Sequence, residues 1–241
     1  HSYPEFIEGK IGKFLNASTF DCYNPYRVTK DGFDWETIEP DNPWSYIGYW
    51  GDHQIIYLLK FLEFAEQHQS GAMESILGNN HYVYANVPYR IKSYGDIVKN
   101  PKDTIEFDHH NEKKIHQRIQ QIGADGALIT ANGTIYRVNF AEKILATVLS
   151  KLSNFVPEGG IWMNTQRPEW NDANNALVGN GVSMVTLYYL RRFLQFLQHV
   201  IENSKSEAVA VSKELHLFYT QLSGVFSSHS HLLGSSIDNK N

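Results

Sequence analysis

The sequence contains a single cysteine, Cys22. One cysteine can form no internal disulfide and cannot supply the several thiolates of a cysteine-rich zinc site. No apolar run reaches the roughly 18 residues that a membrane-spanning helix needs, so we expect no membrane partner. The formal net charge is -5, from 21 basic and 26 acidic residues. This mild acidity argues against nucleic acid as a partner, because phosphates bind to basic surfaces.

Motifs for nucleotides and metals are also missing. The stretch 178–181, Val-Gly-Asn-Gly, does not match the glycine-rich loop that cradles phosphates. Asp108, His109, His110 and His116 lack the His-x-x-x-His spacing of helical zinc sites, and the polar start of a helix explains them better. We therefore predict neither a metal ion nor a cofactor.

The length of 241 residues suits one large domain. With 42% hydrophobic and 13% aromatic residues, the composition predicts a packed core rather than disorder. We interpret 16–51 as a long loop rich in aromatic residues and 227–241 as a frayed tail. The chain starts at His1, without a methionine or a signal peptide. We therefore expect a cytoplasmic protein, and a piece of a longer chain whose other domains are its partners.

Apolar residues recur at helical spacing along much of the chain. We expect helices over 4–15, 52–68, 72–77, 108–122, 140–152, 172–203 and 206–226, and a helical turn near 94–98. In 52–68 and in the middle of 172–203, apolar side chains cover nearly every side, which is typical of a buried helix. The remaining helices are apolar on one side. This pattern predicts an inner and an outer helical layer.

The segment 126–139 has a different character. It predicts a β-hairpin around Asn132-Gly133, because this dipeptide readily adopts the positive φ angles of a tight hairpin turn. Asn139 follows, and Glu142 lies three positions further on, which is the arrangement of a helix-capping box. The sequence therefore predicts an all-α domain with one small β-hairpin.

Two loop-to-helix junctions each place tryptophan beside a carboxylate. The first contains Tyr49, Trp50, Asp52 and Gln54. The second follows Trp162 and contains Arg167, Glu169, Trp170, Asn171, Asp172 and Asn174. Either aspartate can be a simple helix cap, because free N–H groups at a helix start favour a carboxylate. The second junction, however, has more polar groups than a cap requires.

Sugars would satisfy these polar groups, because their hydroxyls accept and donate hydrogen bonds while aromatic rings stack on the apolar face of a pyranose. Cleavage of a glycosidic bond also needs two carboxyl groups. Glu169 and Asp172 would share one face if both lay on the first turn of a helix. That separation is too small for an inverting pair, which needs roughly 6.5–9.5 Å, so the second catalytic carboxylate would come from elsewhere.

Three short motifs resemble those of the six-hairpin (α/α)6-barrel glycosidases. Tyr49-Trp50-Gly51-Asp52 is similar to the Tyr-Trp-Asp motif of trehalase-like members, with Gly51 inserted. The stretches 161–164 (Ile-Trp-Met-Asn) and 170–172 (Trp-Asn-Asp) resemble motifs that carry the catalytic acid in glycogen-debranching and cellobiose-phosphorylase-like members. The whole chain is also similar to the central part of large bacterial proteins of unknown function.

The resemblance implies an α/α toroid, here a partial one, because a complete barrel has twelve helices. It implies Asp172 as the general acid, with Glu169 as the second candidate. Sugar-binding roles would fall to Tyr49, Trp50, Asp52, Gln54, Trp162, Arg167, Trp170, Asn171 and Asn174. We expect an inverting glycoside hydrolase, or a related phosphorylase, that acts on an oligosaccharide. The alternatives are a glycan-binding module without catalysis and a structural helical domain in which these residues are caps.

Overall fold

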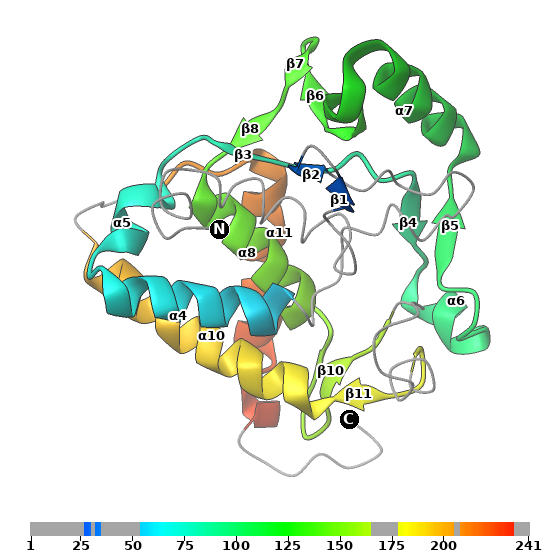
Figure 1. Ribbon diagram of the computed structural model, residues 1–241. Coiled ribbons are helices and arrows are strands. Elements are labelled where there is room, and N and C mark those ends of the chain that lie inside the picture. Colours follow the sequence, from blue (N-terminus) through cyan, green and yellow to red (C-terminus); the bar gives the residue numbers. More distant parts are fainter. Residues whose placement is uncertain (1–26, 30–31, 35–53, 165–177, 205–207, 234–241) are drawn as a thin grey trace.

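The computed structural model describes residues 27–29, 32–34, 54–164, 178–204 and 208–233 (Figure 1). The longer helices of its main body are α4 (Leu59–His68), α8 (Phe140–Leu152), α10 (Met184–Glu202) and α11 (Lys213–Ser228). A π-helical turn, η3 (Gln54–Leu58), leads directly into α4. The short helix α5 (Ala72–Leu77) follows α4, and a 3-10 turn, η5 (Ser230–Leu233), follows α11.

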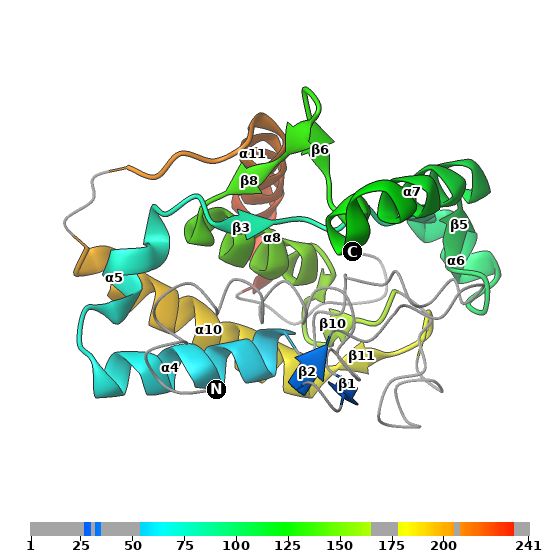
Figure 2. The same cartoon turned by 45° about the horizontal axis from the view of Figure 1, so that its top comes forward.

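The main core lies between α4, α10 and α8. Helix α8 contacts α10 on one side and α11 on the other, so it forms a middle layer (Figures 1 and 2). The fully buried members of this core come from η3, α4, α8, β10 and α10, and they include Ile55, Leu59, Leu62, Phe140, Val148, Ile161, Leu190 and Phe193. No helix in the described part of the chain combines the length and apolar character needed to span a bilayer.

A smaller lobe surrounds α7 (His109–Ile122), at the upper right of Figure 1. It contains the 3-10 turn η4 (Gly123–Ala127), helix α6 (Tyr94–Lys99), and strands β4 (Tyr89–Ile91) and β5 (Ile105–Phe107). Ile115 is fully buried here against Ala127 and neighbouring apolar side chains. Gly126 permits this packing, because a Cβ at that position would lie 2.3 Å from the backbone nitrogen of Ile119.

The strands form several small antiparallel sheets. Two-stranded pairs are β1 (Arg27–Thr29) with β2 (Gly32–Asp34), β3 (Tyr82–Val83) with β8 (Arg137–Val138), β4 with β5, and β6 (Thr130–Ala131) with β7 (Thr134–Ile135). A three-stranded sheet has the order β11 (Val182–Ser183), β10 (Gly160–Trp162), β9 (Phe155–Val156).

The prediction of an all-α fold, and of an α/α toroid, is therefore wrong. The described residues form a mixed helical and sheet structure in which no helical toroid is evident. The physical reason lies in the connections between helices. Segments that lack helical periodicity pair with distant segments through backbone hydrogen bonds, as β3 does with β8 and β11 does with β10. The periodicity of apolar residues locates helices but does not reveal such pairings.

Predictions that rest on local signals are confirmed. Asn132 and Gly133 have φ angles of 52° and 78°, as the turn between β6 and β7 requires. Asp108 caps α7, and Asn139 caps α8 by accepting a hydrogen bond from the backbone N–H of Glu142 at 2.8 Å. Helix α5 has the predicted bounds, and the turn expected near 94–98 is α6.

Other helix predictions need correction. The helix expected from 172 begins at Met184, because β11 precedes it and Ser183 caps it. The helix expected from 206 begins at Lys213, after a cap at Ser212. The two helices expected to be buried on all sides are not. Tyr57 is exposed on η3, Phe61 and Phe64 are exposed on α4, and α10 exposes Val185, Tyr188 and Ile201. Each of these helices therefore buries one face only.

Candidate functional site

Helices α4 and α10 lie side by side and run in the same direction, and the turn η3 that leads into α4 begins at about the level of the start of α10 (Figures 1 and 2). Arg192 on α10 donates two side-chain hydrogen bonds to Glu63 on α4. The bond from Nε to Oε1 is 2.7 Å long. Glu63 is the ninth residue after Gln54, and Arg192 is the ninth after Ser183. At about 1.5 Å per residue, both helical segments therefore begin at nearly equal distances from this ion pair.

Strand β10 places Trp162 at the end of the molecule where η3 and α10 begin. Ile161 pairs with Ser183, the cap of α10, and Trp162 pairs with Val182. The indole Nε1 of Trp162 donates a hydrogen bond to the backbone carbonyl of Gly179 at 3.1 Å. Ile161 also belongs to the core that contains Ile55, at the start of the other helix. Trp162 is thus fixed next to the beginning of α10, as a half-buried side chain.

The residues directly before and after the segment 165–177 lie next to each other, close to Trp162. Met163 accepts a hydrogen bond from the backbone N–H of Gly179 at 2.6 Å and donates one to Gly181 at 3.0 Å. These two bonds close the base of the segment that contains most of the second tryptophan–carboxylate junction. The first junction ends at Gln54, where η3 begins. The described edges of both junctions therefore lie at one end of the α4–α10 pair.

Most of the predicted site residues lie outside the described part of the chain. They are Tyr49, Trp50, Asp52, Arg167, Glu169, Trp170, Asn171, Asp172 and Asn174. For Gln54 only the backbone is described, and Trp162 is the predicted site residue whose side chain is described. The helix expected to begin near Asp172 starts at Met184.

Tyr94 is a neighbour of Trp162 that the sequence interpretation missed. The two ring centroids are 5.4 Å apart, with the rings at 67° in an edge-to-face arrangement. Tyr94 is the first residue of α6 and is 71% exposed. No sequence signal connects these two side chains, because 68 residues separate them (162 − 94).

A second polar cluster, which the sequence interpretation also missed, is buried at the start of α8. Lys143 is 6% exposed, donates a hydrogen bond from Nζ to the carbonyl of Val83 at 2.8 Å, and lies 4.3 Å from the ring centroid of Tyr84. Burial lowers the pKa of Lys143 to about 7, although the nearby Glu142 carboxylate acts in the opposite direction. Burial and Glu142 together raise the pKa of Tyr84.

Glu142 connects this cluster to α11. Its Oε2 accepts a hydrogen bond from the backbone N–H of Ser212 at 2.8 Å, just before α11 begins. The capping box predicted that Glu142 would bond back to the cap residue. Asn139 instead donates its side-chain N–H to the carbonyl of Ala210. Both side chains thus hold the segment before α11 onto α8, which is a structural role.

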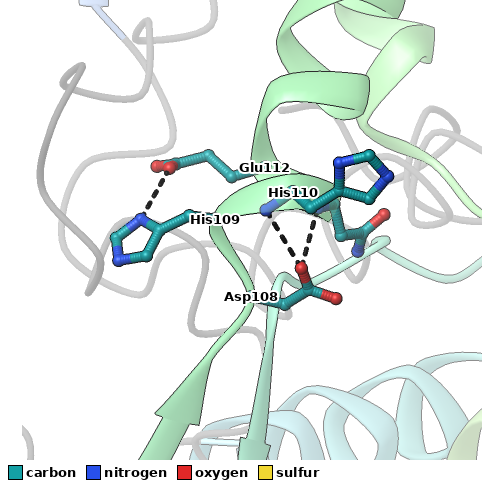
Figure 3. Close-up of polar contacts among 5 residues, drawn as sticks. Asp108, His109, His110 and Glu112 are labelled. Carbon is teal, nitrogen blue, oxygen red and sulfur yellow. Dashed lines mark hydrogen bonds and ion pairs between the residues drawn. The ribbon is translucent and has the colours of Figure 1, made fainter.

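The histidine-rich start of α7 is a capped helix terminus (Figure 3). Asp108 Oδ1 accepts hydrogen bonds from the backbone N–H groups of His110 and Asn111 at 3.0 and 2.9 Å, which lowers the pKa of this carboxyl. His109 Nδ1 lies 3.4 Å from Glu112 Oε2, while His110 points to the other side of the helix. Across the described residues, no group of three or more His, Cys, Asp or Glu side chains could hold a metal ion.

Comparison with known proteins finds no matching family and no curated protein with significant similarity. The resemblance to six-hairpin glycosidases therefore stays a prediction that rests on three short motifs.

Proposed function

We propose that the protein binds an oligosaccharide at the end of the molecule where η3 and α10 begin. The observation that supports this proposal is the level start of the two parallel helical segments, with Trp162 beside them. The described residues that flank the two junctions, Gln54 on one side and Trp162 and Val178 on the other, therefore lie at a single end of the molecule. The two tryptophan–carboxylate patterns, which are far apart in the sequence, are thus both flanked by described residues at this end.

The chemistry of this end suits a sugar. Aromatic side chains offer faces for stacking, and the Arg, Asn, Asp and Glu residues of 167–174 offer donors and acceptors for hydroxyl groups. The start of a helix also contributes unsatisfied backbone N–H groups. The position of Trp162, fixed by Gly179 and by strand pairing, supplies a rigid wall for such a site.

Hydrolysis of a glycosidic bond is the second candidate function. The pair Glu169 and Asp172, three residues apart in the same junction, favours it. In this mechanism Asp172 would donate a proton to the leaving oxygen, and a second carboxylate would activate water. Binding alone would need neither proton transfer nor the second carboxylate.

Titration calorimetry with maltohexaose, cellohexaose, laminarihexaose and chitohexaose tests the binding proposal. We expect at least one of these sugars to bind, and we expect Arg167→Ala to weaken that binding by about tenfold, as for loss of a charged hydrogen-bond donor. Asp125→Asn, an exposed acidic position in η4, is the matched control and should bind like the wild type. Failure of all four sugars to bind would overturn the proposal.

The release of reducing ends from the bound sugar separates the two candidates. If Asp172 is a general acid, Asp172→Asn should lower hydrolysis by roughly 10²- to 10⁴-fold while leaving the calorimetric affinity within a few fold. Binding without any release of reducing ends would reject hydrolysis and retain the glycan-binding module.

A further inference from the structure

We infer that Tyr94 is a sugar-stacking residue that extends the proposed binding site from β10 onto α6 and contacts a pyranose ring beside Trp162. This inference rests on the proposed function, which it deepens by adding a described residue to the site. It concerns a segment, 92–103, that is distant in sequence from both tryptophan–carboxylate junctions.

Tyr94 is largely exposed although it lies beside Trp162, whose position is fixed by its hydrogen bond to Gly179. Tyr94 is 71% exposed although it lies against Trp162, at 5.4 Å between ring centroids. An aromatic side chain placed mainly for stability would bury more of its surface, because the free energy of burial scales with the apolar area removed from water. In the edge-to-face arrangement, the large exposed fraction of the Tyr94 ring is available to a ligand.

The backbone that carries Tyr94 is held in place by several contacts. Ser93 caps α6 by accepting a hydrogen bond from the backbone N–H of Asp96, and the Ser93 hydroxyl donates one to Asp96 Oδ2 at 2.6 Å. Lys92 Nζ forms an ion pair with Asp103 Oδ2 at 2.5 Å across the base of this segment. Strands β4 and β5, which precede and follow this segment in the chain, pair with each other. A preorganised ring loses less conformational entropy when it binds a ligand.

Pro101, shortly after the end of α6, lies close to Gly179, which follows the segment 165–177. Gly179 has a φ of +72°, and a Cβ there would lie 2.5 Å from Cβ of Pro101. The same Gly179 accepts the hydrogen bond from Trp162 Nε1. The segment of Tyr94 and the segment of Trp162 therefore both pack against the residues that follow 165–177. This places Tyr94 at the proposed site as a consequence of backbone packing.

The ligand that fits these features is a neutral pyranose unit of an oligosaccharide. Its axial C–H face packs on an aromatic ring, and the phenol hydroxyl of Tyr94 can exchange hydrogen bonds with sugar hydroxyls. The Tyr94 ring would supply apolar contact area and would orient the sugar. It would therefore contribute to affinity and not to proton transfer.

Calorimetry with whichever of the four hexasaccharides binds the wild type tests this inference. We expect Tyr94→Ala to raise Kd roughly 2- to 12-fold, the range for loss of an aromatic contact. Tyr94→Phe retains the stacking face and should bind within about twofold of the wild type. Tyr219→Ala, an exposed tyrosine on α11, is the matched control and should not change Kd.

The outcomes separate this inference from the proposed function. A wild type that binds a hexasaccharide together with a Tyr94→Ala variant of equal affinity overturns the role of Tyr94 alone. A wild type that binds none of the four sugars overturns both. Tyr94→Trp provides a second variant that keeps an aromatic face, and a loss of affinity as large as that of Tyr94→Ala would also reject stacking.

Discussion

Lys143 donates a hydrogen bond from its buried Nζ to the backbone carbonyl of Val83 at 2.8 Å, and so joins α8 to β3. The contact encloses an amine that water would otherwise solvate. Burial of the charged form is unfavourable, which explains why the pKa of Lys143 falls to about 7. The stability of the fold should therefore depend on pH in a way that a single substitution can reveal.

Lys143→Met should flatten this pH dependence. The folded-state pKa of about 7 lies below the ordinary lysine pKa of 10.5, so between these values the unfolded chain binds a proton that the native state does not. The contribution of Lys143 to the free energy of unfolding consequently rises with pH across that window, by at most about 1.4 kcal/mol per pH unit. Urea unfolding of the wild type and the variant between pH 7 and 9.5 measures the difference.

Lys114→Met is the matched control, because Lys114 lies on the exposed side of α7. It should shift stability equally at every pH in this range. Tyr84 contributes little in this range, because the stability change linked to its raised pKa begins only near the ordinary tyrosine pKa of 10.0. A difference between wild type and Lys143→Met that stays constant from pH 7 to 9.5 would contradict the lowered pKa.

Asn139→Ala should destabilise the protein by about 2 kcal/mol, at the upper end for loss of a helix cap. The side chain is buried and has two roles, since it caps α8 through Glu142 and donates to the carbonyl of Ala210. Chemical denaturation gives the free energy of unfolding. Ser93→Ala removes an exposed cap from the short helix α6 and should lose about 0.5–1 kcal/mol. Equal losses in both variants would show that the contact with Ala210 adds nothing.

Gly126→Ala should lower stability by about 3 kcal/mol, because the new methyl group meets the backbone of Ile119 at 2.3 Å and the backbone cannot move aside without disturbing α7. Gly224→Ala is the opposite case. A Cβ at Gly224, inside α11, meets no atom within 4 Å, so the substitution should stabilise the helix by roughly 0.5–1 kcal/mol. Thermal unfolding of both variants tests whether Gly126→Ala lowers and Gly224→Ala raises the stability. A Gly126→Ala protein as stable as the wild type would contradict the close approach of Gly126 to the backbone of Ile119.

Gly179→Ala should destabilise the contact between the segment of α6 and the base of 165–177. It combines a positive φ, which disfavours any side chain by about 1–2 kcal/mol, with a steric clash against Pro101. The melting temperature should fall clearly relative to Gly78→Ala, where φ is −90° and a Cβ meets open space. The prediction fails if the two variants melt together.

Local parts of the fold could be predicted from sequence because their causes are local. The turn at Asn132-Gly133 depends on the φ preferences of two adjacent residues, and the cap at Asn139 depends on an N–H three residues away. The start of α10 could not be predicted in this way, because Val182 and Ser183 are extended through pairing with β10. The apolar side chains around α4 likewise did not reveal that Phe61 and Phe64 would be exposed.

The candidate site shows the same division. Sequence patterns singled out Trp162 through its motif, and the structure placed it beside the start of α10. Tyr94 was missed, because it lies far from Trp162 in the sequence and the two rings meet only in the folded chain. The register of α4 and α10 was missed for the same reason, since it depends on Glu63 and Arg192, which lie 129 residues apart.

The sequence by itself determined the helix caps, the hairpin turn and the positions of most helices, because hydrogen bonds over two to four residues and side-chain periodicity specify them. Only the tertiary structure decided that short sheets join the helices, that Glu142 bonds to Ser212, and that Tyr94 meets Trp162. These contacts are made between residues far apart in the chain, and they form where burial of the core brings the segments together.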